Sequence, residues 1–169
     1  PSAGHACGAA QPVRAGAHQL DHGGQIGWLN SGLDQAFRDD IAGVVRAAGV
    51  PVKVMLELPL LTAEEKELAV ALSVEAGARY LKNASSGQIE TASVDSIRFL
   101  VARAPQGVLV KASGSLKPYD QAIALLDAGA ALLGTSAGQA ILGRAEGSHV
   151  TSYCLGWQGE KPTEATSVV

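Results

Sequence analysis

Three lysines, Lys53, Lys82 and Lys111, are evenly spaced along the chain, 29 residues apart. They lie in short apolar runs, V-K-V-M-L-E, Y-L-K-N-A-S and V-L-V-K-A-S-G, which are typical of buried parallel strands. Because the protein interior disfavours an ammonium charge, three lysines in successive strands indicate a polar cluster inside the sheet, in one register. A desolvated lysine beside another cation becomes a nucleophilic amine. The pattern therefore predicts Schiff-base chemistry.

Strand and helix patterns alternate along the chain and would position these lysines. We expect strands at about 19–26, 52–58, 79–84, 108–112 and 131–135. We expect helices over 34–48, after the capping box of Thr62 and Glu65, after Ser93, after Pro118, and over 137–143. The alternation predicts an α/β fold with a parallel sheet, either a barrel or a doubly wound sheet.

Composition excludes several classes of function. The 169 residues carry a formal net charge of −3 and no basic cluster, so we expect no nucleic-acid or membrane partner. No apolar stretch approaches the roughly 20 residues of a membrane span. Two distant cysteines, Cys7 and Cys154, are expected to be free thiols in a reduced cytoplasmic protein. The four histidines show no metal-ligand spacing, and we expect neither a metal nor another cofactor.

Loops rich in Gly and Ser follow three of the expected strands. N-A-S-S-G follows Lys82, A-S-G-S follows Lys111, and the last strand runs into G-T-S-A-G before a helix. In parallel β/α folds the active site lies at the carboxyl ends of the strands. Backbone N–H groups of such loops, opening onto helix N-termini, can bind an anion such as phosphate. The sequence thus predicts a phosphate site at this end of the sheet.

Four motifs in order resemble the deoxyribose-phosphate aldolases, class I aldolases with a TIM-barrel fold. They are V-K-V-M-L-E-L-P-L-L-T-A-E-E, G-A-R-Y-L-K-N-A-S-S-G, V-L-V-K-A-S-G and L-L-G-T-S-A-G-Q-A-I-L. G-A-H-Q-L-D, which ends at Asp21, resembles the strand with the family's catalytic aspartate. The resemblance implies reversible C–C bond formation between a small aldehyde donor such as acetaldehyde and an acceptor such as glyceraldehyde 3-phosphate. It implies a cytoplasmic enzyme without a cofactor.

The resemblance also implies a role for individual residues. Lys82 would form the imine with the donor aldehyde, and Lys111 would lie beside it as a second cation. Asp21 would relay protons with Lys111 and water. Lys53 would be a supporting lysine paired with a carboxylate. Apart from the resemblance, we expect Glu57 to be a supporting partner of Lys53 or Lys82 rather than a catalytic group.

Four further residues would hold the substrate phosphate: Gly114, Ser115, Ser136 and Gly87. The loops around them depart from the family pattern. K-N-A-S-S stands for the usual K-T-S-T-G, G-S-L-K for G-G-I-R, and Ala137 for the second of two serines. An aldolase for a non-phosphorylated substrate therefore stays open as an alternative.

The length of the chain sets a second alternative. A TIM barrel typically needs about 250 residues. Counted back from the motifs, the first two strands and most of the third are missing, and residues 1–15 have too few apolar positions to replace them. We expect a partial barrel of about five βα units over 1–143 and a polar tail over 144–169. Its open edges predict a homo-oligomer, and a non-catalytic or repurposed half-barrel subunit is the alternative.

One more departure lies directly after Asp21. The family has an apolar strand at this point, whereas this chain has His22, Gly23 and Gly24. Glycine pairs weaken a strand, and we expect them to leave space beside it.

Overall fold

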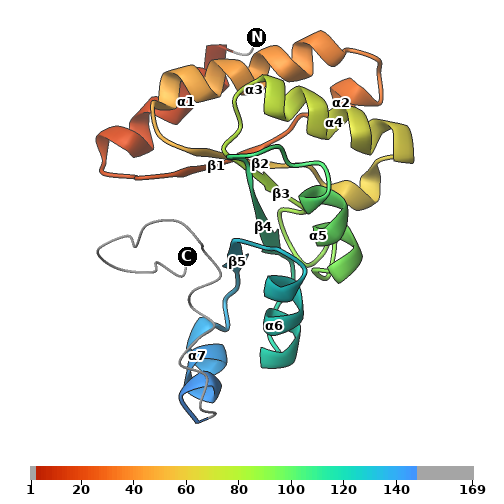
Figure 1. Ribbon diagram of the computed structural model, residues 1–169. Coiled ribbons are helices and arrows are strands. Elements are labelled where there is room, and N and C mark those ends of the chain that lie inside the picture. The colour runs from red at the N-terminus through yellow and green to blue at the C-terminus, as the bar shows by residue number, and fades with distance from the viewer. Residues whose placement is uncertain (1–2, 148–169) are drawn as a thin grey trace.

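A computed structural model gives the fold of the chain and describes residues 3–147 (Figure 1). Strands and helices alternate, as the sequence predicts. The strands are β1 Leu20–Gly23, β2 Val52–Met55, β3 Tyr80–Lys82, β4 Leu109–Ser113 and β5 Leu132–Gly134. The helices are α1 Ala3–Arg14, α2 Ile26–Leu29, α3 Asp34–Ala48, α4 Ala63–Glu75, α5 Val94–Val101, α6 Tyr119–Asp127 and α7 Gly138–Gly147, with a 3₁₀ turn, η1, at Leu58–Leu60.

The strands form one parallel sheet in the order β1-β2-β3-β4-β5. A doubly wound sheet reverses its strand order at a switch point, and the described strands show no reversal. Each strand lies beside the next one in sequence, as in a β/α barrel. The prediction of a partial barrel with about five βα units is confirmed.

Local sequence signals explain where the helices begin and end. Phe37, Ile41 and Val44 recur on one face of α3 and are buried, and Gly49 ends this helix with a positive φ of 63°. At the start of α4, the predicted capping box is present: Thr62 Oγ1 accepts from the Glu65 N–H, and the Glu65 carboxylate accepts from the Thr62 N–H.

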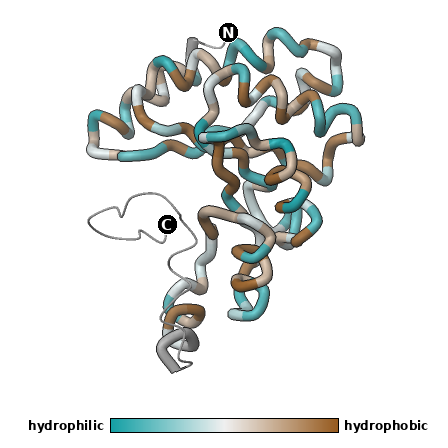
Figure 2. Tube along the Cα trace, in the orientation of Figure 1, coloured by the Kyte–Doolittle hydropathy of each residue, from teal (hydrophilic) through white to brown (hydrophobic). Residues whose placement is uncertain are grey.

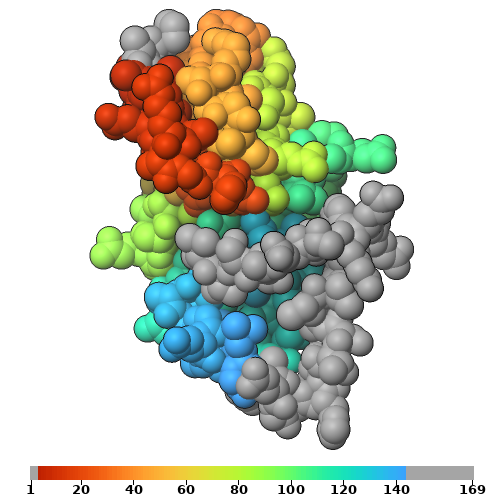
Figure 3. Space-filling view, turned by 90° about the vertical axis from the view of Figure 1, so that its left-hand side faces the viewer, coloured from red at the N-terminus to blue at the C-terminus, as the bar shows by residue number. Residues whose placement is uncertain are grey.

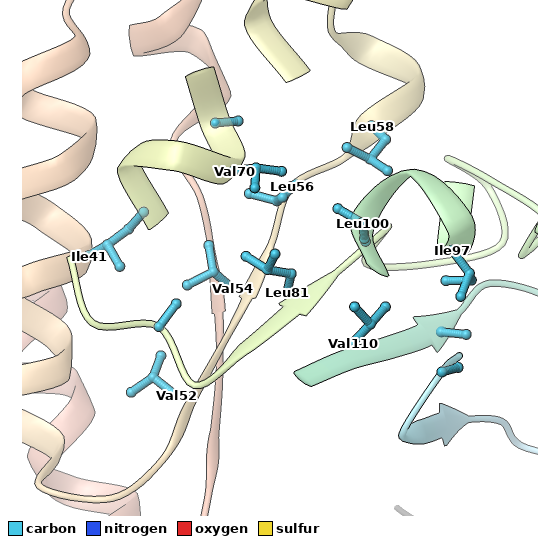
Figure 4. Packing of buried hydrophobic residues seen from close by; sticks show 14 of the residues in the cluster. Ile41, Val52, Val54, Leu56, Leu58, Val70, Leu81, Ile97, Leu100 and Val110 are labelled. Atoms are coloured by element: carbon cyan, nitrogen blue, oxygen red, sulfur yellow. The ribbon is translucent and has the colours of Figure 1, made fainter. Parts of the chain in front are cut away.

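The apolar core lies between the sheet and the helices that cover one of its faces (Figure 4). Val52, Val54, Leu81 and Val110 point from the strands into this layer and are at most 3% exposed. The hydropathy colouring shows brown, apolar stretches along the central strands (Figure 2). Each such side chain stabilises the fold by about 1.5–3 kcal/mol on burial. Because side chains alternate along a strand, the lysines point to the opposite face of the sheet.

The N-terminal segment forms a helix that the sequence analysis does not predict. Helix α1 lies along α3 (Figures 1 and 3). Ala9 is 8% exposed and belongs to the apolar core, and the partly buried Val13 packs against this core. Alanine is the best helix former, and this short Ala-rich stretch gains the rest of its stability from the contact with α3.

The expected space beside Gly24 is absent, because the ring of Phe37 fills it. A Cβ at position 24 would lie 2.9 Å from Phe37 Cε2 and 3.1 Å from the Met55 carbonyl oxygen. The glycine therefore lets α3 approach the end of β1, and the expectation of an empty space was wrong.

The expected boundary at residue 143 falls within α7, which continues to Gly147. The remainder of the expected polar tail, with Cys154, lies outside the described residues, so the division stays a prediction. Cys7 is a free, exposed thiol. Among the described residues, no helix combines the length and apolar character needed to cross a membrane.

Candidate active site

Three lysine side chains converge on the carboxylate of Asp21. Lys82 Nζ and Lys111 Nζ each donate to Asp21 Oδ2 at 3.0 Å. Lys53 Nζ lies 3.1 Å from Oδ1 of the same carboxylate. The sequence analysis predicted a lysine cluster and a carboxylate partner for Lys53, and the geometry contains both.

Strand register explains why these side chains meet. Asp21 pairs with Lys53 across β1 and β2, and Lys82 pairs with Lys111 across β3 and β4. Lys82 also pairs with Met55, two residues beyond Lys53. The expectation of a single register therefore holds for Lys82 and Lys111 and was wrong for Lys53. Strands of a barrel are staggered, and a two-residue offset keeps all three lysines on the same face.

The cluster is largely shielded from water on the lysine side. The three lysines are only 6–8% exposed, whereas 31% of the Asp21 side chain is exposed. Burial raises the pKa of Asp21, but hydrogen bonds and charges from Lys82 and Lys111 outweigh it and lower the pKa from 3.8 to about 2. Asp21 is therefore ionised at neutral pH. Three lysine side chains thus share this one carboxylate.

A buried asparagine connects the two strands that carry Lys82 and Lys111. Asn83 is fully buried; its Nδ2 donates to the Ser113 carbonyl at 2.9 Å, and its Oδ1 accepts from the Ser113 N–H at 2.9 Å. The hydroxyl of Ser113 donates in return to the Ala84 carbonyl. These bonds continue the sheet beyond the end of β3 and hold the two lysines in register. Sequence reasoning noted Asn83 only as a departure from the family pattern.

Glu90 holds Asn83 from the other side. Its carboxylate accepts from Asn83 Nδ2 at 2.8 Å and from the Ser93 hydroxyl at 3.0 Å, and it also accepts from Ser96. Ser93 is the predicted cap of α5, so this network links the helix to the strand end. The sequence predicted the Ser93 cap, but its local pattern did not indicate that Glu90 would be the partner of this serine.

Among the described residues, no lysine pairs with Glu57, and that expectation was wrong. Its carboxylate accepts from the Ser85 N–H at 3.0 and 3.2 Å. The residue follows β2 in a left-handed conformation with φ 48°, which turns its side chain toward the loop after β3. Lys53 and Lys82 instead pair with Asp21 of β1.

Two of the expected phosphate residues, Gly87 and Ser115, lie against each other. A Cβ at position 87 would lie 2.8 Å from the Ser115 backbone nitrogen, so only glycine allows this approach. Gly114 and Ser115 have positive φ values of 121° and 44°, and a Cβ at 114 would overlap the Glu90 carbonyl. The tight turn after β4 thus places Ser115, an exposed residue, beside Gly87.

The fourth expected residue, Ser136, is exposed in the loop after β5. Its neighbour Thr135, which sequence reasoning missed, donates its hydroxyl to the Leu116 carbonyl and accepts from the Ala137 N–H at 2.9 Å. Thr135 therefore ties the loop after β5 to the loop after β4. Two of the three expected phosphate loops are thus held together in the structure.

A second polar cluster lies on the helix side of β1. His5, His22 and Asp40 come from α1, β1 and α3, and their donor atoms gather within 4.8 Å of one another. Sequence reasoning found no ligand spacing among the histidines, because these residues are far apart in the chain. Only the packing of α1 on α3 brings them together.

Comparisons with known proteins find aldolases of similar sequence. Deoxyribose-phosphate aldolase from Thermosynechococcus vestitus is 41% identical over 128 residues, which are 76% of this chain and 58% of the relative. The same enzyme from Methanothermobacter thermautotrophicus is 40% identical over 135 residues, 79% of this chain and 60% of the relative. The chain is a relative of the deoxyribose-phosphate aldolases. It spans about three fifths of the length of the curated relatives it matches.

Solved aldolase structures share the fold of this aldolase relative. The structure "QR15, an Aldolase" matches with a TM-score of 0.80 and 28% identity, over 86% of this chain and 66% of that one. Deoxyribose phosphate aldolase from Aeropyrum pernix matches with a TM-score of 0.73 and 31% identity, over 83% and 59%. No protein-family model matches the chain. The resemblance seen in the motifs is thus confirmed in sequence and in fold.

Proposed function

We propose that the chain is a class I aldolase unit of the 2-deoxyribose-5-phosphate aldolase type, a lyase that forms an imine on Lys82. The observation that carries the proposal is the convergence of Lys82 and Lys111 on one oxygen of Asp21, each at 3.0 Å. Two amines and a carboxylate at hydrogen-bond distance supply a nucleophile, a neighbouring cation and a proton relay.

Each group has a defined task in the proposed reaction. The neutral amine of Lys82 attacks the carbonyl carbon of acetaldehyde, and the carbinolamine loses water to give an imine. Loss of a proton from the adjacent carbon gives an enamine, which attacks the carbonyl carbon of the acceptor. Water then hydrolyses the imine, releases the product and restores the amine.

The choice of Lys82 over Lys111 as the nucleophile rests on the family resemblance of the segment G-A-R-Y-L-K-N-A-S-S-G. The two lysines pair with each other across β3 and β4, so both lie at the same level of the sheet. Peptide mapping of the trapped adduct, described below, distinguishes them. With a pKa of about 2, Asp21 is a weak base. Its role is to orient the amines and to pass protons through Lys111 and water.

The loops after β3, β4 and β5 support a phosphorylated acceptor. Gly87, Gly114 and Ser115 form a close backbone turn, and Thr135 holds the Ser136 loop beside it. We propose that these loops bind the phosphate of glyceraldehyde 3-phosphate. Rates with glyceraldehyde 3-phosphate and with glyceraldehyde test this step. Equal kcat/KM values would favour the aldolase for a non-phosphorylated substrate.

We also propose that the chain works as a homo-oligomer in the cytoplasm. In the described part of the chain, β1 and β5 each pair with one strand, so both sheet edges are open. The deoxyribose phosphate aldolase from Aeropyrum pernix has a tetrameric structure. Light scattering after gel filtration measures the mass, and a monomer at all concentrations would contradict this part of the proposal.

Borohydride trapping tests the central proposal. The chain is incubated with acetaldehyde and borohydride, and intact mass and peptide mapping locate any added ethyl group. We expect the adduct on Lys82, and its loss in Lys82→Met. Lys66→Met, which removes a partly exposed lysine of α4, is the matched control. A folded chain without an adduct on Lys82 would contradict the proposal and favour a non-catalytic half-barrel subunit.

A further inference from the structure

The cluster of His5, His22 and Asp40 has the geometry of a small ligand set. His5 Nδ1 lies 3.0 Å from both carboxylate oxygens of Asp40. His22 Nε2 lies 3.1 Å from Asp40 Oδ2. The two imidazole rings are 5.4 Å apart and inclined at 70°. Both rings thus direct a nitrogen at the same carboxylate.

The residues of this cluster are more buried than charged residues on a protein surface usually are. Asp40 is 2% exposed, the His22 side chain 11% and the His5 side chain 41%. A buried carboxylate is costly unless it is hydrogen-bonded, paired with charge or bound to a metal. The graded exposure leaves the cluster closed toward the core and open to water beside His5.

We propose that His5, His22 and Asp40 bind a divalent first-row transition metal ion, of which Zn²⁺ suits the donors best. Two imidazoles and one carboxylate are a known ligand set for Zn²⁺, with a fourth position left for water. At metal–ligand distances of about 2.0–2.2 Å, tetrahedral ligand atoms lie roughly 3.3 Å apart. The observed separations of 3.0 and 3.1 Å are close to this spacing.

Such an ion would fix α1 to the barrel and hold the strand that carries Asp21. His22 follows Asp21 in β1 and points to the opposite face, toward α1 and α3. A bond from the metal to His22 would therefore restrain β1 from outside, one residue from the carboxylate inside. The site is structural and does not depend on the proposed aldolase reaction.

Calorimetric titration of the metal-free chain with Zn²⁺ tests the proposal. We expect one ion per chain, and an affinity at least about 100-fold weaker in His5→Gln and in His22→Ala. Cys7→Ser and His18→Ala are the matched controls, because both remove exposed potential ligands that are close in sequence to His5 and His22. They should bind Zn²⁺ as the unmodified chain does.

Co²⁺ gives a second readout that does not need a thermal signal. Its visible absorption should report a site of nitrogen and oxygen ligands, and the band should be lost in His5→Gln. This variant changes the most exposed ligand, so circular dichroism is expected to show an intact fold. Absence of Zn²⁺ and Co²⁺ binding, or binding that survives both histidine variants, would overturn the proposal and leave a hydrogen-bonded brace.

Discussion

Two neighbouring residues of β1 organise two different charge clusters on opposite faces of the sheet. Asp21 meets three lysines on the inner face, and His22 meets Asp40 and His5 on the helix side. Inside, cations outnumber the carboxylate and ordered amines are available for chemistry. Outside, one buried carboxylate holds two imidazoles. The inner cluster is thus arranged for reaction, and the outer cluster for attachment of α1.

The largest expected effect is the loss of activity when a lysine of the inner cluster is replaced, compared with a lysine of helix α4. Lys82→Met should lower kcat/KM for aldol condensation by at least about 1,000-fold, because it removes the amine that forms the imine. Lys66→Met should leave the rate near that of the unmodified chain. A steady-state assay with acetaldehyde and glyceraldehyde 3-phosphate measures both. A tenfold loss or less in Lys82→Met would assign the nucleophile elsewhere.

Replacing Asp21 or Asp40 by asparagine shows how much each cluster contributes to the free energy of unfolding. Asp21→Asn should lower the free energy of unfolding by about 3 kcal/mol, because three buried ammonium groups lose their counter-charge. Asp40→Asn should lower it by about 1–2 kcal/mol, since an amide can still hydrogen-bond to the two imidazoles. Urea denaturation of the metal-free chains measures both. A larger loss for Asp40→Asn would reverse the comparison.

Asn83 tests how far the inner cluster depends on the link between β3 and β4. Asn83→Ala should lower the free energy of unfolding by about 2 kcal/mol, because the Ser113 backbone groups lose their buried partners. It should also slow trapping of acetaldehyde on Lys82, as the two lysines lose their fixed register. Ser85→Ala, at an exposed position nearby, is the control. Equal trapping rates in the two variants would rule out a positioning role.

Acid should weaken the inner cluster in a defined range of pH. The pKa of Asp21 is lowered from 3.8 to about 2 in the folded chain, so its contribution to stability is present above the unfolded value and lost as the pH falls toward 2. With 31% of the side chain exposed, the loss should be about 1–2 kcal/mol. Denaturation of the unmodified chain and Asp21→Asn at pH 6 and 2.5 should show their difference shrinking. A constant difference would contradict the lowered pKa.

Elements that depend on local patterns could be predicted from the sequence. The strands around Lys53, Lys82 and Lys111 and the capped helices α4 and α5 follow from periodicity and capping residues, and all are present. Because the lysines repeat with the βα unit, their cluster could also be predicted. Features that depend on contacts between distant segments could not be derived in this way.

Those features include the two-residue offset of Lys53, the Ser85 partner of Glu57 and the ring of Phe37 against Gly24. Each is set by how strands are staggered or how a helix approaches the sheet. Helix α1 belongs to the same group, since its stability comes from packing on α3. The meeting of His5 with Asp40 follows from that packing.

The alternation of charge along β1 also protects its alignment. This edge strand has only four residues, and one of its two ends is a glycine, so shape alone specifies its position weakly. A slip by one residue would turn His22 toward the three lysines and Asp21 toward Asp40. The first change would leave the lysine donors without their carboxylate acceptor. The second would bring two carboxylates together. The pair Asp21-His22 thus specifies the register of β1 in the sheet. It also disfavours the misaligned pairings through which edge strands aggregate.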